Sequence, residues 1–111
     1  MRVAKLYKER VEEYFDKQFV LIGLKQTLDS QNILSAEVVR LMPGASTHYH
    51  DHLDREEGYY IMNGEGILTT DSGEQPARPG QAFYFPTGVK HCIRNTGTCA
   101  LEYVAYGCDA T

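Results

Sequence analysis

The sequence predicts an all-β fold of antiparallel strands, arranged as a sandwich or a barrel. From residue 18 onward, about eight short segments rich in Val, Ile, Tyr, Phe and Thr follow one another at close spacing. Clusters of Gly, Pro, Asn and Asp separate them, as expected for turns. No strand-like segment alternates with a long helical one, which argues against an α/β fold. The chain of 111 residues is of a size for one domain.

The N-terminal residues 1–17 are expected to form an arm, and residues 18–111 the main domain. The charged segment 5–17 has its apolar residues spaced roughly as in a short helix, although a peripheral strand is also compatible with it. Next, residues 18–27 and 33–41 flank a polar turn and predict a β-hairpin.

Beyond this hairpin, Pro43 and Gly44 break the second strand. The remaining predicted strands are short, and in chain order they are 46–52, 59–63, 66–70, 81–85, 91–95 and 100–106. The stretch 71–74 is predicted as a turn. A closed barrel of about eight such strands holds side chains or one small ligand.

Composition and charge exclude several classes of function. The net charge is −4 and the basic residues are scattered, so nucleic acid is not expected as a partner. No segment has the roughly 18–20 consecutive apolar residues that span a bilayer, and no secretory signal is recognised. An odd count of three cysteines, without a C-x-x-C pair, indicates reduced thiols. We therefore expect a cytoplasmic protein that acts on a small molecule and has no membrane partner.

The segment His48-Tyr49-His50-Asp51-His52, followed by Glu57, carries the most informative chemistry. In a regular strand, residues two apart point to the same face, so the three histidines would share one side. Two imidazoles on one face can converge on a metal ion, and a carboxylate after a short loop can join them. Such a set suits Mn, Fe, Co, Ni, Cu or Zn. Glu56 is a competing carboxylate at this stage.

Two longer patterns resemble the motifs of the cupin family. Residues 44–64 read GASTHYHDHLDREEGYYIMNG and match G(X)5HXH(X)3-4E(X)6G at every fixed position. Residues 80–95 read GQAFYFPTGVKHCIRN and match G(X)5PXG(X)2H(X)3N. The two motifs cover about a third of the chain, in the family's order. The chain therefore resembles a small protein with a single cupin domain.

The resemblance implies an antiparallel jelly-roll β-barrel, here with a short N-terminal strand or helix, that holds one divalent transition metal. It places the metal ligands at His50, His52, Glu57 and His91, each at its motif position. The six residues between Glu57 and Gly64 favour Glu57 over Glu56. The motif alone identifies His91, because a single histidine is ambiguous. Small cupins commonly dimerise, so a homodimer is expected, and an edge strand would favour pairing.

A three-histidine, one-carboxylate set leaves one or two positions open on an octahedral ion, where water, O2 or a substrate can bind. This favours a metal-dependent enzyme of the dioxygenase, isomerase or lyase type, acting on a small polar or aromatic metabolite. The alternative is a non-catalytic module that binds a sugar or another small ligand. Tyr59, two residues after the carboxylate, is a candidate acid or base whose pKa an ion could lower. His48 is a second candidate, as a proton relay or an interior polar residue.

Overall fold

The computed structural model describes residues 7–10, 18–22 and 32–110, with side chains described from residue 32 onward. These residues form nine β-strands and no helix. In chain order the strands are β1 (Tyr7–Arg10), β2 (Gln18–Ile22), β3 (Ile33–Leu41), β4 (Arg55–Asn63), β5 (Gly66–Thr70), β6 (Gly73–Ala77), β7 (Ala82–Phe85), β8 (His91–Asn95) and β9 (Leu101–Asp109). All neighbouring strands are antiparallel. The all-β prediction is confirmed.

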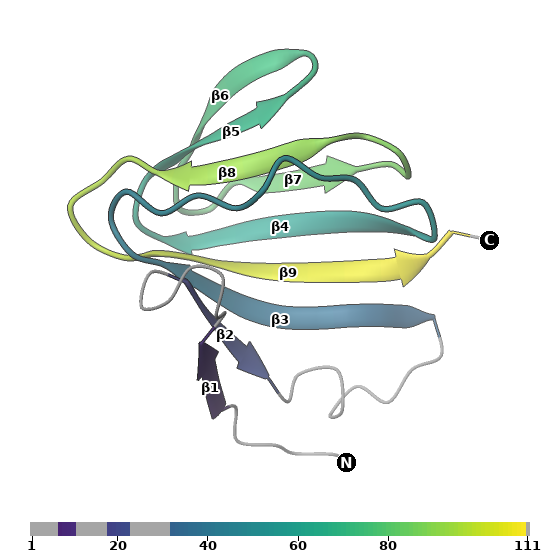
Figure 1. The fold of residues 1–111 in the computed structure, drawn as a ribbon, viewed down its shortest axis with the longest axis horizontal. Helices are drawn as coiled ribbons and strands as arrows, with labels where there is room; N and C mark the ends of the chain where they lie inside the picture. The colour runs from purple at the N-terminus through teal and green to yellow at the C-terminus, as the bar shows by residue number, and fades with distance from the viewer. Residues whose placement is uncertain (1–6, 11–17, 23–31, 111) are drawn as a thin grey trace.

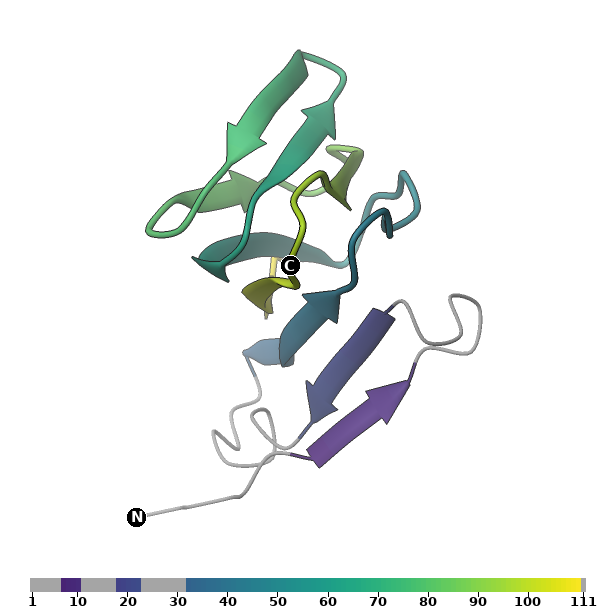
Figure 2. The same cartoon turned by 90° about the vertical axis from the view of Figure 1, so that its left-hand side faces the viewer.

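Six strands form the larger sheet, in the order β1-β2-β3-β9-β4-β7 (Figure 1). The predicted hairpin is present where the structure describes it, with Gln18 of β2 opposite Leu41 of β3. In the predicted arm, β1 pairs with β2, so Tyr7–Arg10 follows the strand alternative. Figure 2 shows β1 and β2 continuing the sheet beyond β3. The rest of the predicted arm, and residues 23–31, lie outside the described residues.

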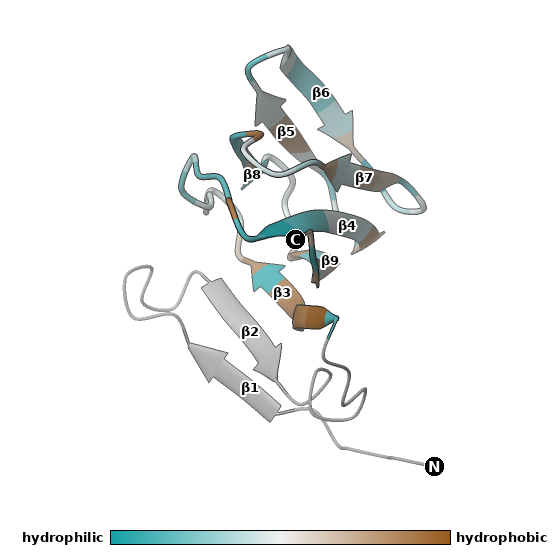
Figure 3. Ribbon diagram, turned by 90° about the vertical axis from the view of Figure 1, so that its right-hand side faces the viewer, coloured by the Kyte–Doolittle hydropathy of each residue, from teal (hydrophilic) through white to brown (hydrophobic). Residues whose placement is uncertain are grey.

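Three strands form the smaller sheet, in the order β6-β5-β8. The outer strand β6 is coloured hydrophilic along most of its length in Figure 3, and its first four residues are exposed. It was not predicted, because Gly73-Glu-Gln-Pro-Ala77 contains none of the β-branched or aromatic residues that indicate a strand. Pro76 is compatible with this place because β6 is an edge strand.

The predicted strand 46–52 is not formed. This stretch is extended but irregular, and it is attached to β8 by two isolated bridges, which pair Ser46 with Arg94 and His50 with His91. The backbone amide of Thr47 also donates to the Ile93 carbonyl, 3.0 Å away. Because a continuous ladder is missing, strict alternation of side chains does not hold here, and this decides where His48 lies.

The hydrophobic core contains side chains from both sheets, as expected for a jelly-roll β-barrel. Side chains alternate along β4 and β8, where Tyr59, Ile61 and Ile93 are buried. The core consists of twelve buried residues: Val39, Leu41, Ala45, Tyr59, Ile61, Leu68, Ala77, Phe85, Ile93, Leu101, Tyr103 and Ala105. Phe83 packs against it. Burial of this kind contributes roughly 25 cal/mol per Å² of apolar surface.

Two motif residues have structural tasks. Gly64 has a φ of 86°, and a Cβ there would lie 2.4 Å from the Ala100 carbonyl oxygen, so no other residue fits this turn without a shift of the backbone. The buried amide of Asn95 donates to the carbonyls of Leu41 and Cys99, at 2.9 Å each, and accepts from the Gly97 amide. Both motif positions thus close corners of the fold.

The three cysteines form no disulfide, as predicted. No stretch of the described chain forms a helix long and apolar enough to cross a membrane.

Candidate metal centre

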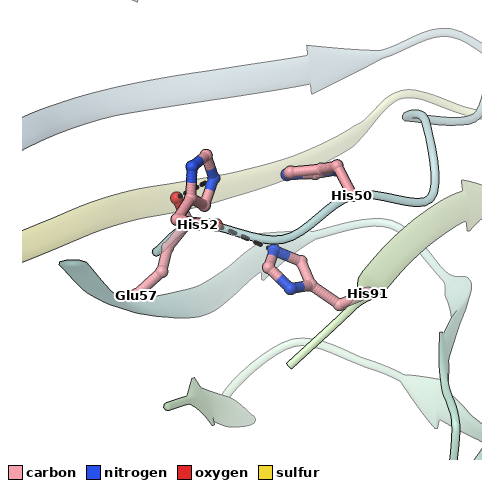
Figure 4. Close-up of side chains that lie close together, drawn as sticks. All are labelled: His50, His52, Glu57 and His91. Atoms are coloured by element: carbon pink, nitrogen blue, oxygen red, sulfur yellow. Dashed lines mark hydrogen bonds and ion pairs between the residues drawn. The ribbon is translucent and has the colours of Figure 1, made fainter. Parts of the chain in front are cut away.

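Four predicted site residues converge at one point. His50, His52, Glu57 and His91 each offer one ligand atom, and these atoms all lie within 4.8 Å of one another. Figure 4 shows the four side chains pointing toward one another from separate parts of the chain. Glu57 lies in β4 and His91 begins β8, whereas His50 and His52 come from the irregular segment before β4. The cluster therefore joins both sheets.

Glu57 lies at the centre of the cluster. Its position in β4, in phase with the buried Tyr59 and Ile61, turns the carboxylate toward the core. Its Oε1 lies 2.9 Å from His91 Nε2 and its Oε2 lies 3.2 Å from His52 Nε2. Burial on its own raises the pKa of Glu57, but the hydrogen bond from His91 and the charges on His52 and His91 bring it below its usual value. Glu57 is therefore ionised at neutral pH.

His91 is held from three sides. Its Nδ1 lies 2.9 Å from the Val89 carbonyl oxygen, and its ring stacks on Phe85 with centroids 3.9 Å apart and planes at 7°. Its Nε2 faces Glu57. The carbonyl and the carboxylate both accept hydrogen bonds, so a neutral imidazole satisfies only one of them. A cation between Nε2 and Glu57 would satisfy the other, and this geometry is what a metal ligand requires.

His50 and His52 form the more accessible half of the cluster. The ring of His50 donates from Nδ1 to the His48 carbonyl, 2.6 Å away, which leaves Nε2 as the nitrogen with a free lone pair. The His52 carbonyl accepts from the Gly88 amide at 2.9 Å, in the turn that begins at Pro86. Burial lowers the pKa of His52, against the opposing charge of Glu57. Its imidazole is therefore neutral, and able to bind a metal, at neutral pH.

The donor set fits a divalent transition metal. Ligand atoms bound at about 2.0–2.2 Å to one ion lie at most about 4.4 Å apart. The observed limit of 4.8 Å means that shifts of a few tenths of an ångström would complete the site. Imidazole and carboxylate ligands suit Mn, Fe, Co, Ni, Cu or Zn, and no thiolate takes part. Within the described residues, this His-His-Glu-His cluster could bind a metal ion.

His48, by contrast, is not part of the cluster. Its side chain is exposed, and its backbone carbonyl accepts a hydrogen bond from the ring of His50. The expected shared face of three histidines is lost because the segment is not a regular strand. Glu56, the competing carboxylate, accepts from the Tyr84 hydroxyl at 2.5 Å on the outer side of β4. A catalytic role of His48 stays a prediction.

Tyr59 is buried next to the cluster, with its ring 5.6 Å from that of His91, centre to centre. Burial, together with the charges on Tyr103 and Glu57, raises the pKa of Tyr59 well above its usual value. The direction is opposite to the one expected for a base. Tyr59 therefore keeps its proton at neutral pH, and its predicted catalytic role requires it to donate that proton.

Three further residues near the cluster were not recognised as site residues. Phe85 of β7 is the ring stacked on His91. The charge of Glu57 acts on both Glu37 of β3 and Arg55 of β4, which also act on each other. A signal for Glu37 was present, because it has the same parity in β3 as the apolar Val39 and Leu41.

Comparisons with known proteins agree with the geometry. A sequence model of the cupin domain matches residues 37–106. A curated oxalate-binding protein from Thermotoga maritima is 36% identical over 93 residues, which cover 75% of this chain and 77% of that protein. The crystal structure of a predicted oxalate decarboxylase from the same organism has a TM-score of 0.79 at 26% identity, covering 95% of this chain and 94% of the other.

A sugar phosphate isomerase of the cupin superfamily from Silicibacter pomeroyi has a TM-score of 0.76 at 24% identity, covering 98% of this chain and 70% of the other, and it supports the fold alone. The residues matched by the family model, 37–106, include both motifs and all four residues of the cluster. The chain belongs to the cupin family.

Proposed function

We propose that this protein binds one divalent transition metal through His50, His52, Glu57 and His91, and uses it to hold a small carboxylate ligand. The convergence of four donor atoms, three imidazole nitrogens and one carboxylate oxygen, carries this proposal. A bound ion would supply Lewis acidity to the ligand's oxygen atoms. The 36% identity to an oxalate-binding protein supports a carboxylate as the ligand.

The surroundings of the cluster support a small ligand with apolar contacts on one side. Tyr59, Phe85 and His91 form a continuous set of rings, with centroids 5.0 Å apart for Tyr59 and Phe85. His50 and His52 are partly exposed, whereas Glu57 and His91 are buried. A ligand can therefore approach from the side of the two accessible histidines while the rings exclude water from the other side.

We further propose an enzyme of the lyase or isomerase type, with Tyr59 as proton donor to a ligand on the ion. The buried, protonated phenol beside the cluster supports this assignment. The dioxygenase alternative has no specific support from the residues described. If the protein binds its ligand without converting it, the native chain should release the ligand unaltered, and Tyr59→Phe should bind it with the same affinity.

The test measures metal and ligand on the purified protein. We expect about one ion per chain by elemental analysis, and binding of oxalate or glycolate by calorimetry that is lost after chelation and restored by Mn²⁺ or Co²⁺. His52→Ala should remove the ion. His48→Ala is the matched control, since it changes a histidine nearby and keeps the backbone carbonyl that orients His50. Carboxylate binding that survives chelation would contradict the proposal.

A homodimer also remains a proposal. The strand β1 stands at the edge of the larger sheet and pairs only with β2 among the described strands, so its other side can accept a strand from a second copy. Light scattering at micromolar concentration should give twice the mass of the chain. A mass equal to one chain would contradict it.

A further inference from the structure

A second carboxylate shares the inner face of the larger sheet with the metal-binding Glu57. Glu37 lies on β3, opposite Ala105 of β9, and Ala105 lies opposite Tyr59 of β4. Glu37, Ala105 and Tyr59 thus form one row across three neighbouring strands. Val39, two residues after Glu37, is buried in the core, so the Glu37 side chain leaves the sheet on the core side. It faces the same side as Glu57.

The strand between Glu37 and the cluster carries small residues. Ala105 and Gly107 occupy the inner face of β9, and Gly107 lies between Ser35 and Glu57 in the register. A Cβ on Gly107 would lie 2.6 Å from the Ser35 hydroxyl oxygen and 2.8 Å from Cδ of Arg55. The stem of Arg55 therefore crosses Gly107 from β4 toward β3. On β9 itself only Ala105 and Gly107 lie between Glu37 and Glu57, and the Ser35 hydroxyl and the stem of Arg55 lie above Gly107.

Within the described part of the chain, nothing hydrogen-bonds to the Glu37 carboxylate, although the side chain is only partly exposed. Arg55 is the cation that acts on it, but the guanidinium of Arg55 donates two hydrogen bonds to Asp54, at 2.9 and 3.0 Å. Burial, and the charge of Glu57, raise the pKa of Glu37. A partly exposed carboxylate that faces the inner side of the sheet can accept a hydrogen bond from a ligand.

We infer that Glu37 is a specificity-determining residue of the metal site, whose carboxylate accepts a hydrogen bond from a hydroxyl group of the ligand. The inference rests on the proposed function, because it concerns a ligand held by the ion. It narrows the ligand class to a hydroxy acid, which chelates through one carboxylate and one hydroxyl oxygen. A dicarboxylate such as oxalate would instead bring a second negative charge to the same side as Glu37.

The charges near the ion predict how the loss of the Glu37 charge changes the affinity for each kind of ligand. A dication there favours the ionised form of Glu37, as it does for any nearby carboxylate. The charges of Glu37 and Glu57 together then offset that of the ion, while Arg55 is paired with Asp54. Removing the charge of Glu37 makes the site more positive. The variant should therefore bind a dianion such as oxalate more tightly. It should bind a hydroxy acid less tightly, because the carboxylate that accepts the hydrogen bond of its hydroxyl group is gone.

The test compares oxalate and glycolate on three proteins loaded with Mn²⁺: the native chain, Glu37→Gln and Glu56→Gln. The control removes the same charge from the outer side of β4, where Glu56 meets Tyr84. For Glu37→Gln we expect the ratio of oxalate affinity to glycolate affinity, measured by calorimetry, to rise about tenfold or more. Glu56→Gln should leave this ratio within about twofold of the native value.

Metal analysis separates the two ways in which the inference can fail. If the native chain holds no ion, the proposed function fails and the inference falls with it. If all three proteins hold the ion but Glu37→Gln leaves the ratio unchanged, only the role of Glu37 is overturned. A ratio that shifts equally in Glu56→Gln also overturns it, since the effect is then one of net charge. Loss of the ion from Glu37→Gln would make Glu37 part of metal binding, contrary to the inference.

Discussion

The two halves of the metal cluster are built in different ways. Glu57 and His91 are buried, they lie on regular strands, and a stacked ring and a backbone carbonyl hold His91 in place. His50 and His52 lie on an irregular segment with two isolated bridges, and they are partly exposed. The difference teaches that the regular strands of the barrel preorganise one half of the cluster, whereas the other half is less firmly held and more accessible.

The first and largest expected effect compares His91→Ala with His50→Ala. Both variants should lose the ion. In metal-free protein, His91→Ala should lower the free energy of unfolding by about 2–4 kcal/mol, because it leaves a void and a buried carboxylate without its partner. His50→Ala should cost less than about 1 kcal/mol, as expected for a partly exposed side chain. Urea denaturation with chelator present measures both, and equal losses would erase the distinction between the two halves.

Acid should affect metal binding next most strongly. The pKa values of His52 and Glu57 are both lowered in the folded protein. At neutral pH the imidazole of His52 is therefore neutral and the carboxylate of Glu57 is ionised, which are the forms that bind a metal. As the pH falls, protons compete with the metal for His52 and then for Glu57, and affinity should drop by about tenfold by pH 5. A competition titration with a metal-sensitive dye measures this.

The metal-free protein should also lose stability in acid, and the sign is the same for both groups. A lowered pKa in the folded state means that the unfolded state binds more protons as the pH falls. The contribution of His52 is therefore lost below about pH 6.5, and that of Glu57 below about pH 4.3. Denaturation that shows constant stability from pH 7 to pH 4 would contradict these shifts.

Asn95→Ala tests whether a structural residue of the second motif contributes to stability without contributing to metal binding. Asn95 is buried and ties together Leu41, Cys99 and Gly97 without touching the cluster. We expect a loss of about 2–3 kcal/mol in the free energy of unfolding, because the buried carbonyl of Leu41 and the partly buried carbonyl of Cys99 lose their donor. The affinity for metal in the folded protein should stay within about threefold of the native value. A larger change in affinity would mean that this corner also positions His91.

The smallest expected effect comes from Phe85→Leu, which removes the ring stacked on His91 while keeping an apolar side chain. We expect a loss of about 1–1.5 kcal/mol in stability and a metal affinity weaker by about threefold to tenfold. Phe83→Leu, on the same strand but not stacked on a histidine, is the matched control. If both variants bind metal equally well, the stacked ring does not position the ligand.

The chemistry of the site was predictable to a larger extent than its local structure. His50, His52 and Glu57 follow from residue type and spacing, and His91 follows from the second motif. The prediction of a strand at 46–52 is wrong. The segment forms only two isolated bridges with β8 and not a continuous ladder, whatever the strand propensity of its residues. The strand β6 was missed because tertiary pairing with β5 overrides a weak local preference.

Glu37 shows what sequence patterns leave out. Its parity in β3 marks it as a charged residue on a core-facing position, but only the register with β9 and β4 shows that it shares a row with Tyr59. Likewise, the upward shift of the Tyr59 pKa comes from burial and from the charges of other residues, and one of these, Tyr103, is distant in sequence. Such relations between strands arise from topology, which a single sequence does not specify.

The contact between Glu57 and His91 has a mechanical consequence. The two residues are 34 positions apart, and their strands belong to different sheets. An ion bound to both would join the two sheets in the folded protein only, and would therefore stabilise the folded state over the unfolded one. The melting temperature would then rise with the logarithm of the free metal concentration. The stability of the contact between the two sheets would thus depend on the concentration of free metal.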